Sequence, residues 1–168
     1  MPVSTTVLQR IEAENKIEPQ WIVGPEAGQF LHDLVLKLKP EAIVEIGTSV
    51  GYSAIWMASA LKEIGKGKLW TIESHEERFV KAEKNIEEAG LKEWITQIKG
   101  HAPEVFEKLN SLPLEIDLAF IDATKHETPL YIEALKPRLK KNALLLIDNV
   151  QSHRFGVMAE TIEALYKD

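Results

Sequence analysis

Apolar residues along this chain alternate between strand-like and helix-like spacing. Residues 43–46 form a short run rich in β-branched side chains, which predicts a buried strand. Residues 52–61 carry apolar side chains at helical spacing, and Gly47 and Gly51 lie between the two runs. We therefore predict a strand, a glycine turn and a helix in that order.

The same alternation continues along the rest of the chain. Five strands separated by helices predict a doubly wound, Rossmann-like α/β fold with a mostly parallel sheet, whose ligand site lies at the carboxyl ends of the strands. The second helix is expected to bury Phe30, Leu31, Leu34, Val35 and Leu38. Besides the helix that begins at residue 52, we expect helices at residues 5–15, 25–40, 75–89, 103–110, around Tyr131 to Leu139 and at about 155–167. The four later strands are expected to end at Glu73, just before His101, at Asp122 and at Asp148, the last of them covering residues 143–148.

The glycine turn predicts a binding site. It brings a helix N-terminus and bare backbone N–H groups to the end of a strand, where glycine lets a ligand approach closely. Gly47 and Gly51 do not supply the three glycines of a dinucleotide fingerprint, and Glu45 suits a ligand with a cationic end better than a pyrophosphate. A turn that only packs the helix on the strand is the competing interpretation.

Composition limits the possible functions. The 168 residues are 45% hydrophobic and 27% charged, which predicts one globular domain over residues 1–168 with a helical extension at 1–24. The net charge of −6 disfavours nucleic acid as a partner. The lack of cysteine excludes a disulfide, a thiolate zinc site and a cysteine nucleophile. Without a signal segment or an apolar run long enough for a membrane, we expect a cytoplasmic protein.

Acidic residues recur at the predicted strand ends. Glu73 suits the two hydroxyls of a ribose, although acids there also favour the dipole of the following helix. Asp122, Asp148 and Asn149 offer hard oxygen ligands that suit Mg²⁺; the alternative is that they form caps and turns. Lys125, three residues after Asp122, is a candidate general base, or else a solvated lysine.

Several motifs carry a family resemblance. The pattern E-x-G-x-x-x-G-Y-S resembles the first motif of the S-adenosylmethionine-dependent methyltransferases. From about Pro25 to Val150, the stretches VEIGTSVGYSAIWMA, WTIES, AFIDATKHETPLY and LLLIDNV resemble the cation-dependent O-methyltransferases, the family of catechol and caffeoyl-CoA O-methyltransferases. The resemblance implies transfer of a methyl group from S-adenosylmethionine to a hydroxyl of a small vicinal-diol or catechol-like acceptor, beside a second oxygen, both held by a divalent cation.

The resemblance also implies residue roles. Lys125 and Asp122 would be catalytic, and Asp122, Asp148 and Asn149 would bind the metal. The cofactor pocket would contain Glu45, Gly47, Thr48, Gly51, Tyr52, Ser53, Glu73, Ser74, His101, Ala102 and Asp122.

Some positions depart from the family pattern. His101 and Thr124 stand where many relatives carry acids, and Asn142 replaces a usual glycine pair. His101 therefore either borders the adenine or acts as a surface or capping residue. Relatives also have a longer N-terminal segment. Their sheets contain two further strands, which we expect this sheet to lack.

Two further expectations concern partners and function. The apolar edge of the fifth strand should be covered by the helix at about 155–167 or by a second chain in a homodimer. Two other functions stay open: methylation of a hydroxylated base in RNA, and S-adenosylmethionine binding without catalysis.

Overall fold

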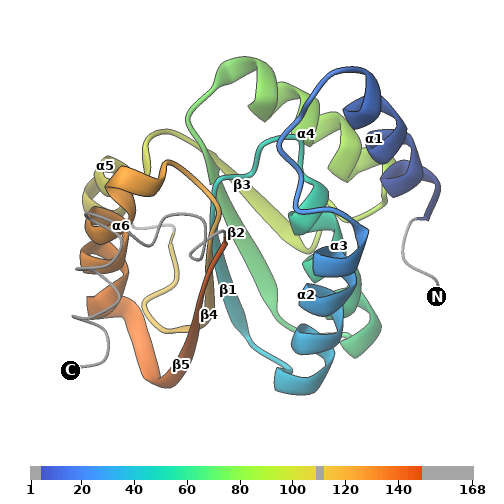
Figure 1. Ribbon diagram of the computed structural model, residues 1–168. Coiled ribbons are helices and arrows are strands. Elements are labelled where there is room, and N and C mark those ends of the chain that lie inside the picture. The colour runs from blue at the N-terminus through green and yellow to red at the C-terminus, as the bar shows by residue number, and fades with distance from the viewer. Residues whose placement is uncertain (1–4, 109–111, 149–168) are drawn as a thin grey trace.

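A computed structural model describes residues 5–108 and 112–148 of the chain (Figure 1). Five strands form one sheet in the order β3-β2-β1-β4-β5, and all four neighbouring pairs are parallel. The predicted Rossmann-like α/β class is confirmed. The elements are α1 (Thr5–Ile17), α2 (Pro25–Leu38), β1 (Ala42–Ile46), α3 (Tyr52–Ile64), β2 (Lys68–Glu73), α4 (Glu76–Glu88), β3 (Ile95–Lys99), α5 (Ala102–Lys108), β4 (Ile116–Ile121), the 3₁₀ turn η1 (Lys125–Glu127), α6 (Thr128–Leu135), the 3₁₀ turn η2 (Lys136–Arg138) and β5 (Leu139–Ile147).

Helices cover both faces of the sheet, and each face has its own core. Figure 1 shows α1 to α4 on one side and α5 and α6 on the other. Successive strand residues point to opposite faces, so Ile43 packs with the first group and Val44 with the second. The chain winds outward from β1 to β3 and returns to β4 on the other side of β1, which puts the topological switch point between β1 and β4.

The buried face of α2 differs from the predicted one. Leu31 and Val35 are buried as expected, but Phe30 and Leu38 are 57% and 44% exposed. The helix packs on α3 around Gly28, where an added Cβ would lie 2.3 Å from Nε1 of Trp56. The buried face of α2 therefore consists of Gly28, Leu31, His32 and Val35, with Gly28 against the indole of Trp56.

The prediction of a helix containing Leu139 was wrong. Helix α6 ends at Leu135, a 3₁₀ turn covers Lys136–Arg138, and Leu139 begins β5. Pro137 lacks the N–H group that a continuing α-helix needs, so the helix tightens and stops. The register of β5 against β4 then shifts between Ile116 and Leu118, and Asn142 adopts a positive φ of 69° within this irregular stretch.

The last part of the sequence lies beyond the described stretches. Asn149, the predicted helix at about 155–167 and the cover that this helix would give to β5 fall there. The homodimer stays a prediction. Within the described stretches, no helix is both long enough and apolar enough to cross a membrane.

Gly47 allows the carboxyl ends of β1 and β4 to approach each other closely. Its φ is +103°, and an added Cβ would lie 2.0 Å from the carbonyl oxygen of Asp122. Both the backbone conformation and the backbone contact therefore require glycine.

We expect Gly47→Ala to lower the free energy of unfolding by about 3 to 5 kcal/mol, because it combines backbone strain with overpacking. Gly65→Ala is the matched control, since Gly65 also has a positive φ, of +77°, but meets nothing within 4 Å. The control should lose only the strain, about 1 to 2 kcal/mol, in urea unfolding. Equal losses in the two variants would contradict the close-approach argument.

Candidate functional site

A cavity of about 560 Å³ opens at the carboxyl edge of the sheet. Segments that follow all five strands line it, together with the connection between α1 and α2. The lining residues used below are Trp21, Gly47, Ser49, Glu73, Ser74, His75, Arg78, His101, Ala102, Asp122, Lys125, Tyr131 and Asp148.

The structure brings most, but not all, of the predicted site residues to this cavity. Eight of them line it: Gly47, Glu73, Ser74, His101, Ala102, Asp122, Lys125 and Asp148. The other predicted cofactor residues, Glu45, Thr48, Gly51, Tyr52 and Ser53, are not among the lining residues.

Glu73 presents a carboxylate that the backbone holds in place. Its Oε2 accepts a hydrogen bond from the N–H of Ser49 at 2.8 Å, and its Oε1 accepts one from the N–H of His75 at 2.8 Å. The residue is only 5% exposed, yet it borders the cavity. Glu76 and Glu77 occupy the first turn of α4 and can stabilise the dipole of that helix, so Glu73 is not needed for this role.

Two carboxylates from neighbouring strands share another part of the cavity. Asp122 follows β4 and Asp148 follows β5, and the N–H of Asp148 donates to the carbonyl of Ile121 at 2.9 Å. Burial raises the pKa of Asp122, the ammonium of Lys125 opposes this shift, and the carboxylate of Asp148 adds to it. Nζ of Lys125 lies 3.2 Å from Oδ1 of Asp122.

The donors in this part of the cavity fit a hard divalent cation. Asp122 and Asp148 offer only oxygen, and a cation between them would offset both the burial of the Asp122 carboxylate and the like charge of Asp148, which raise the pKa of Asp122. In the part of the chain that the structure describes, no group of three His, Cys, Asp or Glu side chains is placed to hold a metal. The predicted third ligand, Asn149, lies outside that part.

Glu45 lies beneath the glycine turn in a chain of hydroxyl groups. Ser53 Oγ donates to Oε1 and Thr71 Oγ1 donates to Oε2, each at 2.5 Å, and Thr71 shares a further 2.5 Å hydrogen bond with Thr48. The carboxyl is fully buried, and burial raises its pKa to about 7 against the effect of these two donors. In the structure Glu45 therefore ties the end of β1 to β2 and α3.

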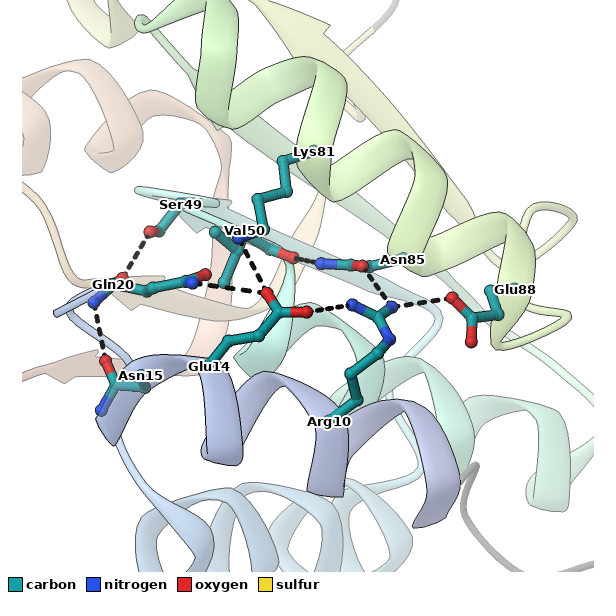
Figure 2. Close-up of polar contacts among 9 residues, drawn as sticks. All are labelled: Arg10, Glu14, Asn15, Gln20, Ser49, Val50, Lys81, Asn85 and Glu88. Atoms are coloured by element: carbon teal, nitrogen blue, oxygen red, sulfur yellow. Dashed lines mark hydrogen bonds and ion pairs between the residues drawn. The ribbon is translucent and has the colours of Figure 1, made fainter. Parts of the chain in front are cut away.

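A network from α1 holds the same turn from outside (Figure 2). Arg10 donates to Oδ1 of Asn85 at 2.8 Å, and Nδ2 of Asn85 donates to the carbonyl of Val50 at 2.8 Å. Asn85 is 2% exposed, so both ends of its amide need these partners. Arg10 also pairs with Glu14 and Glu88, at 2.7 Å each.

The sequence pattern alone did not reveal this network. A polar residue between Ala82 and Ile86 on the buried side of α4 is the one signal that marks Asn85. Its partners come from positions 75 and 35 residues away, which periodicity does not connect.

Hydrogen bonds from Lys81 and Arg10 lower the pKa of Glu14 to about 2, which keeps this contact between α1 and α4 charged over the physiological range.

His101 has partners that the sequence did not indicate. Its Nδ1 lies 2.6 Å from Glu104, its Nε2 lies 3.1 Å from Glu127, and the hydroxyl of Tyr131 donates to Glu127 at 2.7 Å. Hydrogen bonding to Glu127, assisted by Glu104, raises the pKa of His101. The imidazole thus links the starts of α5 and α6 while it borders the cavity.

Comparison with known proteins identifies a family and individual relatives. Residues 4–165 match the O-methyltransferase family. The chain is 34% identical over 133 residues to a catechol O-methyltransferase of Niastella koreensis, covering 79% of this chain and 59% of that protein. It is 30% identical over 146 residues to a catechol O-methyltransferase of Mycobacterium tuberculosis, covering 87% and 64%. The alignments thus span less than two thirds of either relative.

A solved structure has the same fold. The O-methyltransferase from Bacillus cereus in complex with SAH superimposes with a TM-score of 0.80 and is 26% identical. The alignment covers 99% of this chain and 78% of that one.

The buried Glu45 predicts a specific pH dependence of stability. Between the ordinary pKa of 4.5 and about 7, the folded protein keeps a proton on Glu45 that the unfolded chain has released. The free energy of unfolding should therefore fall as pH rises through this window. In urea unfolding, the wild type should lose about 2 kcal/mol more than Glu45→Gln between pH 5 and pH 8, since the amide cannot ionise. Parallel pH profiles for the two proteins would contradict this prediction.

Proposed function

The chain belongs to the O-methyltransferase family, and from this premise we propose that it transfers the methyl group of S-adenosylmethionine to one hydroxyl of a small catechol-like acceptor. The observation that carries the proposal is that one cavity is bordered both by the fixed carboxylate of Glu73 and by the group of Asp122, Lys125 and Asp148. Catechol as the acceptor class follows the names of the two relatives. A cytoplasmic location and a homodimer remain predictions.

The cofactor would lie against the ends of β1, β2 and β3. Oε2 of Glu73 accepts the N–H of Ser49 and keeps accepting capacity for a ribose hydroxyl, while Oε1 accepts the N–H of His75 and also lies 3.2 Å from Nδ1 of that exposed imidazole, which a second ribose hydroxyl would replace. Ser74, His101 and Ala102 border the same space, where an adenine would fit beside the ribose. The related Bacillus cereus enzyme was solved in complex with SAH, which supports a cofactor of this chemical class. The sulfonium of the bound cofactor supplies a methyl group that is already activated for transfer.

The acceptor would lie beside the acid pair. We propose that Asp122 and Asp148, together with Asn149, hold a divalent cation such as Mg²⁺, which would orient two neighbouring acceptor oxygens and acidify one of them. Lys125 would act as the general base and accept the proton of the reacting hydroxyl. Its position is set by Asp122, 3.2 Å away, and it is only 18% exposed, so it has little freedom to leave the cavity.

The cofactor assignment predicts a loss of affinity in Glu73→Gln. This change removes the charge but keeps the shape, and the dissociation constant of SAH in calorimetry should rise about 10- to 100-fold, the size of a lost charged hydrogen bond. Glu77→Gln is the control, because this exposed acid in the first turn of α4 does not border the cavity. No SAH binding by the wild type would refute the proposed function, and unchanged binding by Glu73→Gln would refute the ribose role.

The acid and base assignments predict a second pattern, in methyl transfer to catechol. Chelation should abolish turnover and added Mg²⁺ should restore it. Lys125→Ala should lower turnover about 10²- to 10⁴-fold, the usual contribution of a general base, and should leave SAH affinity unchanged. The loss should shrink at high pH, where the hydroxyl ionises without help. Lys92→Ala removes a lysine that is 66% exposed and serves as the control. Turnover that survives chelation would refute the metal role.

A further inference from the structure

The 3₁₀ turn that carries Lys125 is held in place by Glu127, a residue that the mechanism above does not use. Glu127 is the last residue of this turn, and its carboxylate contacts His101, just before α5, and Tyr131, in α6. It is not among the residues that line the cavity. Resting on the proposed function, we propose that Glu127 is a positioning residue, which holds the turn so that Lys125 can accept the proton of the acceptor.

Both carboxylate oxygens of Glu127 have partners from other elements. Nε2 of His101 lies 3.1 Å from Oε1 and 3.1 Å from Oε2, and the hydroxyl of Tyr131 donates to Oε2 at 2.7 Å. The imidazole also meets the Tyr131 ring edge-on, with 6.3 Å between the ring centroids. Because α5 and α6 pack against each other (Figure 1), these contacts fix the turn to a packed pair of helices.

The charges of these groups favour the contacts. Hydrogen bonds from Tyr131 and His101 lower the pKa of Glu127, so this side chain stays a carboxylate. Hydrogen bonds to Glu127 and Glu104 raise the pKa of His101 against the effect of burial, which favours the imidazolium form that donates from both nitrogens. Burial and the hydrogen bond to Glu127 raise the pKa of Tyr131, so its hydroxyl keeps the proton that it donates. Charge-assisted hydrogen bonds of this kind are stronger than neutral ones.

The position of Glu127 determines the position of Lys125 because the turn is short. The N–H of Thr128 donates to the carbonyl of Lys125, and the N–H of Glu127 donates to the carbonyl of Thr124 at 3.1 Å. The backbone on both sides of Lys125 is thus bonded to the residues around Glu127, and Nζ of Lys125 lies 3.2 Å from Oδ1 of Asp122. Misplacement of a reacting group by about 1 Å can cost about 100-fold in rate, so release of this turn should weaken the base.

A contact with the cofactor is the competing role for this group of residues. His101 borders the cavity where an adenine would fit. Its two ring nitrogens, however, already lie within hydrogen-bonding distance of carboxylates, Nδ1 at 2.6 Å from Glu104 and Nε2 at 3.1 Å from Glu127. Both polar atoms of the imidazole are therefore used within the protein, and we assign the group to the turn.

The first experiment measures methyl transfer to catechol and SAH affinity in Glu127→Gln. This change keeps the shape and removes the charge, and turnover should fall about 10- to 100-fold while the dissociation constant of SAH stays within about twofold. The loss should shrink at high pH and should nearly vanish in a Lys125→Ala background, because both changes disable one proton acceptor. Tyr131→Phe, which removes a donor to Glu127, should lower turnover in the same way. Glu133→Gln is the control, since its side chain is 71% exposed on the same helix, α6.

The second experiment needs no turnover and so separates this inference from the proposed function. Lys125 is only 18% exposed, and its acetylation by acetic anhydride is followed by mass spectrometry. Faster acetylation of Lys125 in Glu127→Gln than in the wild type and in Glu133→Gln supports the inference even if the wild type transfers no methyl group. Unchanged acetylation overturns it, as does a turnover loss that persists at high pH or adds fully to Lys125→Ala. Weaker SAH binding in Glu127→Gln assigns the residue to the cofactor and also overturns it.

Discussion

The close approach of two backbones at the sheet's switch point sets the geometry of the whole cavity. Gly47 passes the carbonyl of Asp122 where no Cβ fits, while the N–H of Asp122 donates to the carbonyl of Ile46 at 2.9 Å. The N–H groups of Gly47 and Thr48 both donate to the carbonyl of Ile72, at 3.0 and 3.2 Å. The glycine turn is thus hydrogen-bonded to β2 on one side and packed against the end of β4 on the other. This arrangement fixes the strand ends after which Glu73 and Asp122 border the cavity.

The polar groups around the glycine turn fix its conformation more than they add to the free energy of unfolding. Buried hydrogen-bonded acids and amides gain little net energy, but an unpaired one would cost several kcal/mol, so each restricts the turn to one arrangement. Glu45 restricts it from below through hydroxyl groups, and Asn85 restricts it from the α1 side through the carbonyl of Val50. Ser49 reaches both Glu73 and the chain before Trp21, so one residue aligns the two walls of the cavity.

Sequence patterns predicted what depends on local spacing and missed what depends on distant contacts. The strand, glycine turn and helix at residues 43–61 and the acids at strand ends follow from periodicity and from the topology of parallel sheets. The packing of α2 places Gly28 against the indole of Trp56, and the pairing of Trp21 with Arg78 joins positions 57 residues apart, so neither contact has a periodic signal in the sequence. The sequence pattern correctly predicts that Glu45 belongs to the first strand. The alternation of side chains along a strand does not reveal that hydroxyl groups surround its carboxyl.

The two halves of the cavity differ in how far the protein alone completes them. Around Glu73, backbone N–H groups already hold the carboxylate, so a ligand meets an arranged site and loses little to reorganisation. Around Asp122, burial and then the carboxylate of Asp148 raise the pKa of this acid, against the opposing effect of Lys125. A cation and an acceptor oxygen would bring what this half lacks. The proposed reaction therefore belongs at the boundary between an arranged half, suited to hold the methyl donor, and an incomplete half, suited to be finished by the acceptor.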